Sequence, residues 1–227
     1  MQISIIIPVL NEAAEIVTTL ASLQHLRTQS AEIIVVDGGS RDDTVTLAQP
    51  LADLVICSDQ GRAQQMNAGA RCASGNILLF LHADTHLPAD AHHLIVKGLA
   101  ENDQRWGRFD VRLSGSHPLL RAVESLMNWR SRLTGIASGD QAIFVRRDGF
   151  MKIGGFPEIP LMEDIALSHL LKKQGKPLCL HARVTTSSRR WERAGIVRTI
   201  LLMWRLRLAY ALGADPERLA AKYYKSQ

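Results

Sequence analysis

The stretch LLFLHADTHLP, residues 78–88, begins as an apolar run and ends with His82, Asp84 and His86 at every second position. If the chain stays extended there, alternation places these three side chains on the same side. One carboxylate and two imidazoles can bind a divalent cation, and imidazole, a softer donor than oxygen, favours Mn²⁺ over Mg²⁺. The alternative is a polar strand exit that binds no ligand.

A second group of polar residues follows the apolar run EIIVV in the sequence DGGS. Gly38 and Gly39 allow the backbone to turn sharply, which leaves Asp37 placed to accept hydrogen bonds from a base or a ribose. Neither the G-x-G-x-x-G pattern of dinucleotide-binding folds nor the phosphate-loop pattern is present. The alternative is a turn aspartate that caps the next helix.

Arginines that can bind phosphate occur in two places. Arg62 follows Gly61 at the start of an expected helix, and the sequence SSRRW contains Arg189, Arg190 and Trp191. A guanidinium binds phosphate oxygens through paired hydrogen bonds, and the indole can stack on a sugar or an acceptor. The alternatives are an ordinary helix start and a basic loop with a packed tryptophan.

Two adjacent acids, Glu163 and Asp164, begin the segment EDIALSHLLKKQG. A carboxylate in this position can act as the general base for an attacking hydroxyl, a role typically worth about 10²–10⁴-fold in rate. Acids in the first turn and lysines in the last turn also complement the dipole of a helix, which is the alternative explanation.

Composition limits the class of protein. Of the 227 residues, 46% are hydrophobic and 22% are charged, as in a soluble globular protein. The three cysteines are too few and too widely spaced for a disulfide framework or a zinc site, which favours a reducing compartment. The beginning MQISIIIPVLNE lacks a basic leader, and its apolar run is too short for a signal peptide, so a cytoplasmic protein is expected.

The net charge of +5 is concentrated near the C-terminus, where residues 183–227 contain ten Lys or Arg and three Asp or Glu. Such a segment favours nucleic acid, anionic lipid or a phosphorylated substrate, or is a solvated basic face. Because no RNA-binding signature of aromatic residues and glycine accompanies the charge, we expect no nucleic-acid partner.

Strands and helices alternate in the first hundred residues. Strands are expected at 3–7, 32–37, 54–58 and 76–82, with helices capped by Asn11 and over 42–49 and 62–73. This order predicts an α/β unit with a largely parallel sheet. Its strands end in Asn11, Glu12, Asp37, His82 and Asp84, at the edge where open α/β sheets bind ligands.

The second half has a different pattern. Strands are expected at 105–115, 140–147 and 177–186, and helices at 118–133, 163–175 and 192–212. The last helix contains Arg193, Arg198, Arg205 and Arg207. A bilayer-spanning helix is not expected, because each arginine costs about 2.5–3.5 kcal/mol at the membrane centre. The helix is expected to pack on the core or to lie at a membrane surface.

Taken in order, the segments SIIIPVLNE, IIVVDGGSRDDT, GRAQQMNAGA, LLFLHADT, GDQAIFVRRDGFMKIGGF and LMEDIALSHLLKKQG resemble the motif series of family 2 glycosyltransferases. HADT and SSRRW further resemble a small bacterial subgroup, the radical-SAM/selenodomain-associated transferases. The resemblance implies a single GT-A domain over 1–227, an α/β fold with a Rossmann-like, mostly parallel sheet. Its parts would be a nucleotide-binding half (1–100), an acceptor half (101–191) and a basic helical tail (192–227).

The resemblance implies donor-binding roles for four residues. Pro8 and Glu12 match the loop that borders the nucleotide, Asp37 matches the acid that holds the base, usually uracil, and Arg62 matches a contact to the nucleotide or its diphosphate. Arg189 or Arg190 is a further candidate for binding the diphosphate.

The resemblance also implies a metal and a base. HADT takes the place of the family's Asp-x-Asp motif: Asp84 keeps the second acid, His82 replaces the first, and His86 is a further candidate ligand for Mn²⁺ or Mg²⁺. Asp164 matches the general base of inverting members, with Glu163 supporting it.

Arg190 and Trp191 resemble the Arg-Trp pair in the Q-x-x-R-W motif of processive members, but Ser187 replaces the glutamine, so processive synthesis is not expected. The expected function is inverting transfer of a sugar from a nucleotide-diphosphate donor, expected to be a UDP-sugar, to a hydroxyl acceptor.

Two other functions compete with this one. The first is a nucleotide-sugar-binding module that does not catalyse transfer. The second, ranked lower, is a sugar-phosphate nucleotidylyltransferase, whose activating loop needs glycines and a basic residue that IPVLNEAAE lacks. Peripheral contact with the inner face of a membrane through residues 192–212 is a further expectation. The motifs do not encode the sugar, the acceptor or the oligomeric state.

Overall fold

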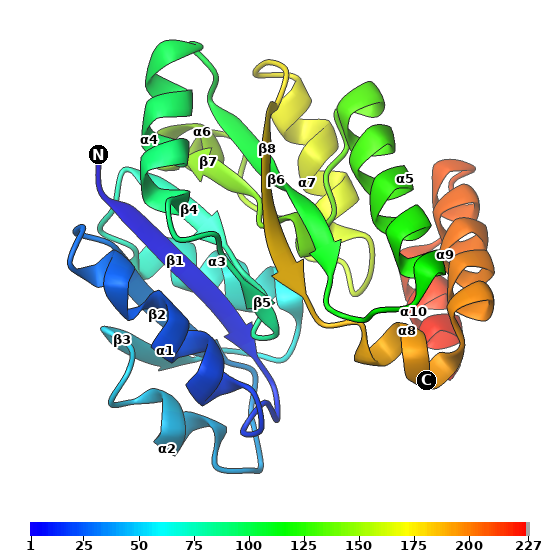
Figure 1. Ribbon diagram of the computed structural model, residues 1–227, viewed down its shortest axis with the longest axis horizontal. Coiled ribbons are helices and arrows are strands. Elements are labelled where there is room, and N and C mark those ends of the chain that lie inside the picture. The colour runs from blue at the N-terminus through cyan, green and yellow to red at the C-terminus, as the bar shows by residue number, and fades with distance from the viewer. Residues whose placement is uncertain (226–227) are drawn as a thin grey trace.

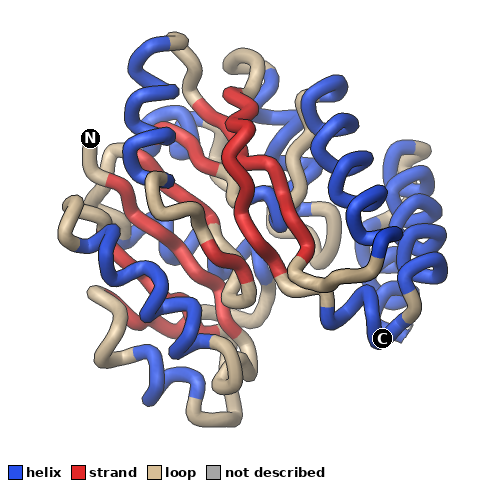
Figure 2. Tube along the Cα trace, viewed as in Figure 1, coloured by secondary structure: helices blue, strands red, loops and turns tan. Residues whose placement is uncertain are grey.

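An eight-stranded mixed sheet with helices on both faces forms the centre of the computed structural model (Figures 1 and 2). The structure describes residues 1–225, with the side chain of Arg190 excepted. The strand order is β3-β2-β1-β4-β7-β6-β8-β5. The strands are β1 (Ile3–Val9), β2 (Glu32–Asp37), β3 (Leu54–Cys57), β4 (Ile77–Phe80), β5 (Thr85–His86), β6 (Trp106–Leu113), β7 (Phe144–Arg146) and β8 (Leu178–Thr186).

The helices cover the two faces of the sheet, and α8, α9 and α10 lie beyond its β6 and β8 side (Figure 1). They are α1 (Ile16–Arg27), α2 (Thr44–Ala48), α3 (Arg62–Cys72), α4 (Ala91–Glu101), α5 (Pro118–Thr134), α6 (Arg147–Lys152), α7 (Glu163–Lys172), α8 (Arg189–Ala194), α9 (Ile196–Ala211) and α10 (Pro216–Lys225), with a 3₁₀ turn, η1 (Gly139–Gln141). Within residues 1–225, we find no helix that has both the length and the hydropathy of a membrane-spanning segment.

The apolar run of β1 is buried on both faces, because successive side chains of a strand point to opposite sides. Ile5 and Ile7 belong to the core layer under α1 and α4, whereas Ile6 belongs to the layer that contains α3. β3, β2, β1 and β4 are parallel to one another, so the α/β unit predicted for the first hundred residues is confirmed. Their carboxyl ends lie at the same edge of the sheet.

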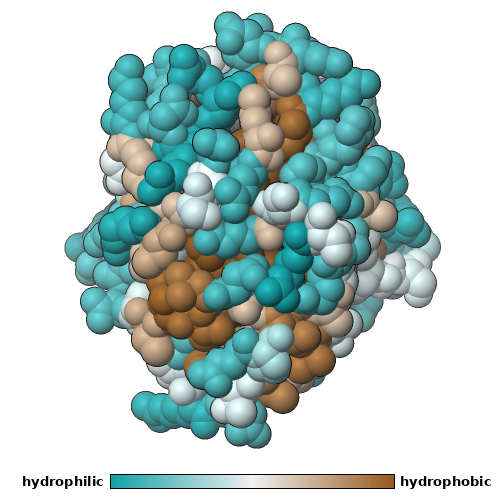
Figure 3. Space-filling model, turned by 90° about the vertical axis from the view of Figure 1, so that its left-hand side faces the viewer, coloured by the Kyte–Doolittle hydropathy of each residue, from teal (hydrophilic) through white to brown (hydrophobic). Residues whose placement is uncertain are grey.

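The edge of the sheet at β3 is short and partly apolar. β3 has four residues, and its Leu54, Val55 and Ile56 are only partly buried. Figure 3 views the molecule from the side on which β3, α1 and α2 lie in Figure 1, and shows hydrophobic patches between hydrophilic side chains. A short edge strand offers few unpaired backbone groups to another chain, which limits edge-to-edge association.

Several expected elements have different boundaries. The helix expected over 192–212 is interrupted at Gly195, whose φ of +84° separates α8 from α9. Asn11 does not cap α1, which begins at Ile16; the Asn11 side chain instead accepts a hydrogen bond from the backbone N–H of Arg41. The strand expected over 140–147 is reduced to β7, because its first residues form η1. Helices α4 and α6 were not predicted from the sequence.

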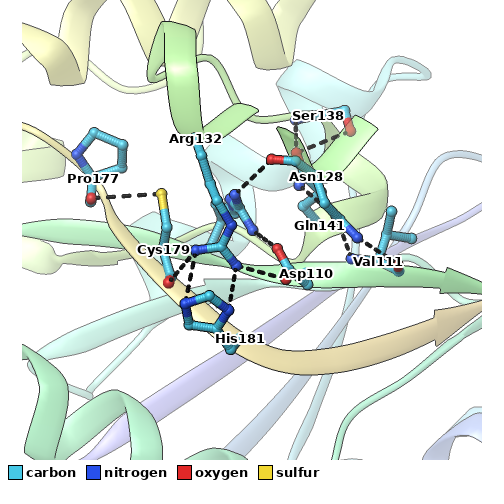
Figure 4. A network of polar contacts seen from close by, with 10 residues as sticks. Asp110, Val111, Asn128, Arg132, Ser138, Gln141, Pro177, Cys179 and His181 are labelled. Atoms are coloured by element: carbon cyan, nitrogen blue, oxygen red, sulfur yellow. Dashed lines mark hydrogen bonds and ion pairs between the residues drawn. The ribbon is translucent and has the colours of Figure 1, made fainter. Parts of the chain in front are cut away.

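A buried ion-pair network joins β6, α5 and β8 (Figure 4). The guanidinium of Arg108 is fully buried and pairs with Asp110 two residues along β6. Arg132 of α5 donates to the other carboxylate oxygen of Asp110 at 2.6 Å and to the carbonyl oxygen of Cys179 in β8 at 3.2 Å. Asp110 thus joins β6 to α5, and Arg132 joins α5 to β8.

Asn128 extends this network toward η1. Its side-chain amide exchanges two hydrogen bonds with the backbone of Val111, at 2.8 and 3.0 Å, in the manner of a neighbouring strand. Its oxygen also lies 3.4 Å from Nε2 of Gln141, and the Gln141 oxygen accepts from the backbone N–H of Ser138. The turn that contains Ser138 is therefore held by the same buried network.

Replacing Asp110 with alanine should lower the free energy of unfolding by about 3–5 kcal/mol, because it leaves the buried charge of Arg108 unpaired. The measurement is urea denaturation of the wild type and Asp110→Ala. The control is Asp148→Ala: Asp148 pairs with Arg105 at 3.5 Å on the surface, and we expect a change of less than about 1 kcal/mol. A cost for Asp110→Ala no larger than that of the control would contradict the prediction.

Candidate active site

A cavity of about 490 Å³ lies at the carboxyl edge of the parallel strands. Its wall combines the loops after β1 and β4 and the start of α3 with η1, the start of α7 and the end of β8, and is completed by α8, α9 and α10. Eight of the residues predicted from the sequence line it: Pro8, Glu12, Arg62, His82, Asp84, Glu163, Asp164 and Trp191. Residues of both halves of the chain therefore meet in one cavity.

Asp37 does not line the cavity. Its buried carboxylate accepts hydrogen bonds from the backbone N–H groups of Gly39 and Ser40, each at 3.0 Å, so it stabilises the turn after β2. Asp37 is nevertheless the β2 partner of Val9, which does line the cavity. The residue thus lies next to the site, and its contact with a base stays a prediction.

The expected alternation of His82, Asp84 and His86 along a strand is wrong. β4 ends at Phe80, and the chain then turns, with the Thr85 N–H donating to the His82 carbonyl at 3.1 Å. His82 and Asp84 face the cavity, whereas His86 lies in β5 outside it, with Nδ1 3.3 Å from the Ser22 hydroxyl of α1.

The SSRRW segment is divided between the cavity and its surroundings. Trp191 lines the cavity and also packs against the apolar cluster of α5. Arg189 is exposed and pairs with Glu15 at 2.6 Å, outside the cavity lining. The side chain of Arg190 lies outside the described residues.

Asp164 is held rigidly at the start of α7. One carboxylate oxygen accepts the backbone N–H of Gly139 at 2.8 Å, and the other accepts the N–H of Ile165 at 2.7 Å. Each carboxylate oxygen retains a further lone pair for an additional partner. The side chain is half-buried and faces the cavity, so it can accept a proton from a bound hydroxyl.

Acidic side chains crowd the centre of the cavity. Burial and the neighbouring charge of Asp164 raise the pKa of Glu163 to about 6. Burial also raises the pKa of Glu12, and the charge of Asp84 adds to this effect. Strongly perturbed carboxylates in a cavity are frequent at functional sites, because catalysis and cation binding both require close charges.

Arg62 is the cationic counterpart of these acids. Burial lowers the pKa of its guanidinium, but the charges of Glu163 and Asp140 outweigh this effect and raise the pKa above its usual value. Burial alone would raise the pKa of Asp140; a hydrogen bond and the charge of His82, whose Nδ1 is 3.4 Å away, instead hold it below its usual range.

The carboxylates of the cavity need further oxygen ligands, from water or phosphate, to hold a divalent cation. Among residues 1–225, no three His, Cys, Asp or Glu side chains converge closely enough to hold a metal ion. Asp84 and Glu12, whose charges oppose each other in the cavity, provide hard oxygen donors. A divalent cation that keeps waters and binds one or two carboxylates plus phosphate oxygens needs no larger protein cluster. The residues therefore fit a cation that arrives with a diphosphate.

Sequence reasoning missed several residues of this region. Asp140 lies in the quoted segment GDQAIFVRR, but a single acid there had no distinguishing pattern. Arg207 of α9 lines the cavity, and its charge helps to lower the pKa of Arg130, after burial, to about 10. Within residues 1–225, the buried Nε atoms of both arginines have no hydrogen-bond partner. Nothing in the sequence indicated that α9 would reach the cavity.

The fold, an α/β domain with its cavity at the carboxyl edge of the parallel strands, is of the GT-A type. The family model described as glycosyl transferase family 2 matches residues 4–151, which is more than half of the chain. The chain belongs to this family, and the resemblance found in its motifs is confirmed at that level.

Curated relatives cover part of the chain. A PGL/p-HBAD biosynthesis glycosyltransferase of Mycobacterium bovis is 42% identical over 91 residues, which are 37% of this chain and 36% of the relative. An uncharacterized glycosyltransferase of Haemophilus influenzae is 26% identical over 163 residues, 67% of this chain and 55% of the relative. The chain therefore spans about a third of the first relative and about half of the second.

Solved structures share the fold at low sequence identity. Staphylococcus aureus TarS in complex with UDP-GlcNAc has a TM-score of 0.69 and 19% identity, covering 83% of this chain and 59% of that chain. The mannosyltransferase PcManGT of Pyrobaculum calidifontis, in complex with GDP-Man and Mn²⁺, has a TM-score of 0.68 and 24% identity, covering 95% of this chain and 66% of that chain. The predicted GT-A fold is confirmed.

Glu163→Gln should stabilise the protein near neutral pH and have no such effect in acid. Below the ordinary pKa of 4.5 the side chain is protonated in both the folded and unfolded states, so the neutral amide changes little. As the pH rises from 4.5 to about 6, Glu163 ionises in the unfolded chain before it does so in the folded protein, so the wild type loses about 2 kcal/mol of stability that the glutamine variant keeps.

Thermal denaturation of Glu163→Gln and the wild type, at about pH 7.5 and about pH 4, measures this difference. The control is Glu158→Gln, because Glu158 is exposed. Equal melting temperatures for Glu163→Gln and the wild type at the higher pH would show that Glu163 ionises without a penalty.

Proposed function

We propose that this domain transfers a sugar from a nucleotide-diphosphate donor, preferably a UDP-sugar, to a hydroxyl acceptor with inversion at the anomeric carbon. The observation that carries the proposal is the single cavity shared by Arg62 and Asp84 of the first half and Asp164 of the second. Glycosyl transfer needs a cation for the departing diphosphate and a carboxylate for the incoming hydroxyl, and both are available there.

The donor would bind across the strand ends. We place its base near the turn after β2, where Asp37 lies, and its diphosphate between Arg62 and Asp84. Pro8 and Glu12 would border the nucleotide. Solved structures of similar fold are complexes with UDP-GlcNAc and with GDP-Man and Mn²⁺, which supports a nucleotide sugar and a divalent metal as ligands here. That the nucleotide is UDP rather than GDP is part of the proposal, because these structures are only 19% and 24% identical to this chain.

Asp84 and Glu12, with His82 nearby, would hold the metal, which when bound neutralises negative charge on the departing diphosphate. Arg62 adds a fixed positive charge to the same region, and Arg189 can approach from the rim, since its charge already acts on Glu12. Charges that are placed before the reaction stabilise the transition state without reorganisation.

Asp164 would act as the base. The Gly139 and Ile165 N–H groups fix its carboxylate, and burial together with the charge of Asp164 raises the pKa of Glu163. The acceptor hydroxyl gives its proton to Asp164 while its oxygen attacks the anomeric carbon opposite the diphosphate. The bond to the diphosphate oxygen breaks as the new bond forms, so one displacement inverts the configuration.

A nucleotide-sugar-binding module without catalysis is the second candidate. It is favoured by the histidine at position 82, in place of the first metal-binding acid, and by the lack of a converged three-ligand site within residues 1–225. Incubation with UDP-sugars and Mn²⁺ separates the two, because an enzyme of this type slowly hydrolyses its donor to UDP. Membership of the radical-SAM/selenodomain-associated subgroup and cytoplasmic location stay predictions.

Asp164→Asn should reduce the rate of sugar transfer, or the rate of donor hydrolysis, by at least about 100-fold. Donor binding should be retained, because only the proton acceptor is lost. UDP release measures the rate, and calorimetric titration with UDP measures binding. Asp148→Asn, on the surface, is the matched control and should keep the wild-type rate. A rate for Asp164→Asn within a few-fold of the wild type would exclude Asp164 as the base.

Asp84→Ala should weaken Mn²⁺-dependent UDP binding by at least about tenfold, because it removes a hard oxygen ligand. The matched control is His86→Ala, since His86 lies outside the cavity. Calorimetric titration of UDP with and without Mn²⁺ compares the variants. If both variants lose the same affinity, or if Mn²⁺ does not affect UDP binding by the wild type, the proposed metal site is wrong.

A further inference from the structure

Two neighbouring helices expose a row of large apolar side chains each. On α9 these are Val197, Leu201, Trp204 and Leu208, with exposed fractions between 57% and 65%. On α5 they are Leu126, Trp129 and Leu133, with exposed fractions between 52% and 70%. Within each row the residues recur at spacings of three or four, so each row lies along one side of its helix.

The two rows border one seam. α5 and α9 lie side by side, at the right in Figure 1, and pack through Val123 and Met127 of α5 and Ile196 and Ile200 of α9. Trp204 follows Ile200 by one turn, which places its row next to the packed residues of α9. Leu126 similarly follows Val123 by three residues on α5. The seven residues therefore form one continuous area, the α5–α9 apolar surface.

This area is unusual for an exposed region. Singly scattered apolar residues are common on protein surfaces, whereas a contiguous patch marks a site of interaction. Two tryptophans, Trp129 and Trp204, are 64% and 65% exposed within it. Tryptophan is enriched at the interface between water and lipid, where its apolar ring and its N–H group are both accommodated.

Positive charge borders the α9 side of the same area. Arg198 and Arg205, each next in sequence to a residue of the α9 row, are exposed, and so is Arg193 of α8. Residues 183–227 contain ten Lys or Arg and only three Asp or Glu. An amphipathic helix with apolar and basic sides lies at the surface of anionic membranes, where burial of its apolar side and attraction to the headgroups act together.

We propose that the α5–α9 apolar surface docks on a lipid bilayer that contains anionic lipids. The charge distribution favours this partner over a second copy of the chain, because two copies joined through the surface would bring their arginines together, and like charges at an interface oppose association. Docking goes beyond the proposed transfer reaction and does not depend on it, since α5 and α9 expose these residues whatever the cavity binds.

Co-sedimentation of the whole chain with vesicles tests this. With phosphatidylcholine vesicles that contain phosphatidylglycerol, we expect the wild type to sediment, and the emission of its exposed tryptophans to shift to shorter wavelength. The double variant Trp129→Ser/Trp204→Ser should need at least about tenfold more lipid for half-maximal binding. Arg198→Gln/Arg205→Gln should weaken binding to these vesicles and leave binding to pure phosphatidylcholine unchanged.

The matched control is Met151→Ser. Met151 is an apolar residue of α6 that is 41% exposed and does not belong to the α5–α9 apolar surface. Circular dichroism checks that each variant is folded. Wild type that remains in the supernatant, or a tryptophan double variant that binds as the wild type does, would overturn the proposal. The proposal would also be overturned if the wild type formed a dimer, the double variant were monomeric, and neither bound lipid. UDP titration of the same samples tests the donor site separately.

Discussion

The pairing of Arg108 with Asp110 is the interaction on which the geometry of the site depends. A charge as deeply buried as that of Arg108 must keep its partner Asp110, and Asp110 also accepts a hydrogen bond from Arg132 of α5, which fixes β6 against α5. The hydrogen bonds of Asn128 and Gln141 continue from there to the turn whose N–H group holds Asp164. The position of a proposed catalytic carboxylate is thus set by charges in the core of the second half.

The cavity brings several acidic side chains close together. Burial, together with the charges of neighbouring carboxylates, raises the pKa of both Glu12 and Glu163. A protein gains nothing in stability from such an arrangement, so it is best understood as preorganisation for a ligand of opposite charge. Arg62 moderates the repulsion and, by the same placement, offers a contact to a phosphate.

The sequence predicted those features that depend on local pattern. The apolar run of β1 identified a strand buried on both faces, and the order of strands and helices identified a parallel sheet with its ligands at the carboxyl edge. The direction of side chains after β4 could not be predicted, because alternation holds only while the chain stays extended and His82 begins a turn. Likewise, packing of α9 against the cavity joins residues distant in sequence, and no local pattern encodes it.

Helix α9 has two distinct sides. Thr199, Met203 and Arg207 form part of the cavity wall, while the row that includes Trp204 faces outward. The thickness of a single helix, about 10 Å, therefore separates the reaction space from whatever covers the outside. Any tilt or shift of α9 would change the shape of the acceptor side of the cavity. Binding to the outer side of α9 and selectivity for the acceptor would therefore be mechanically linked.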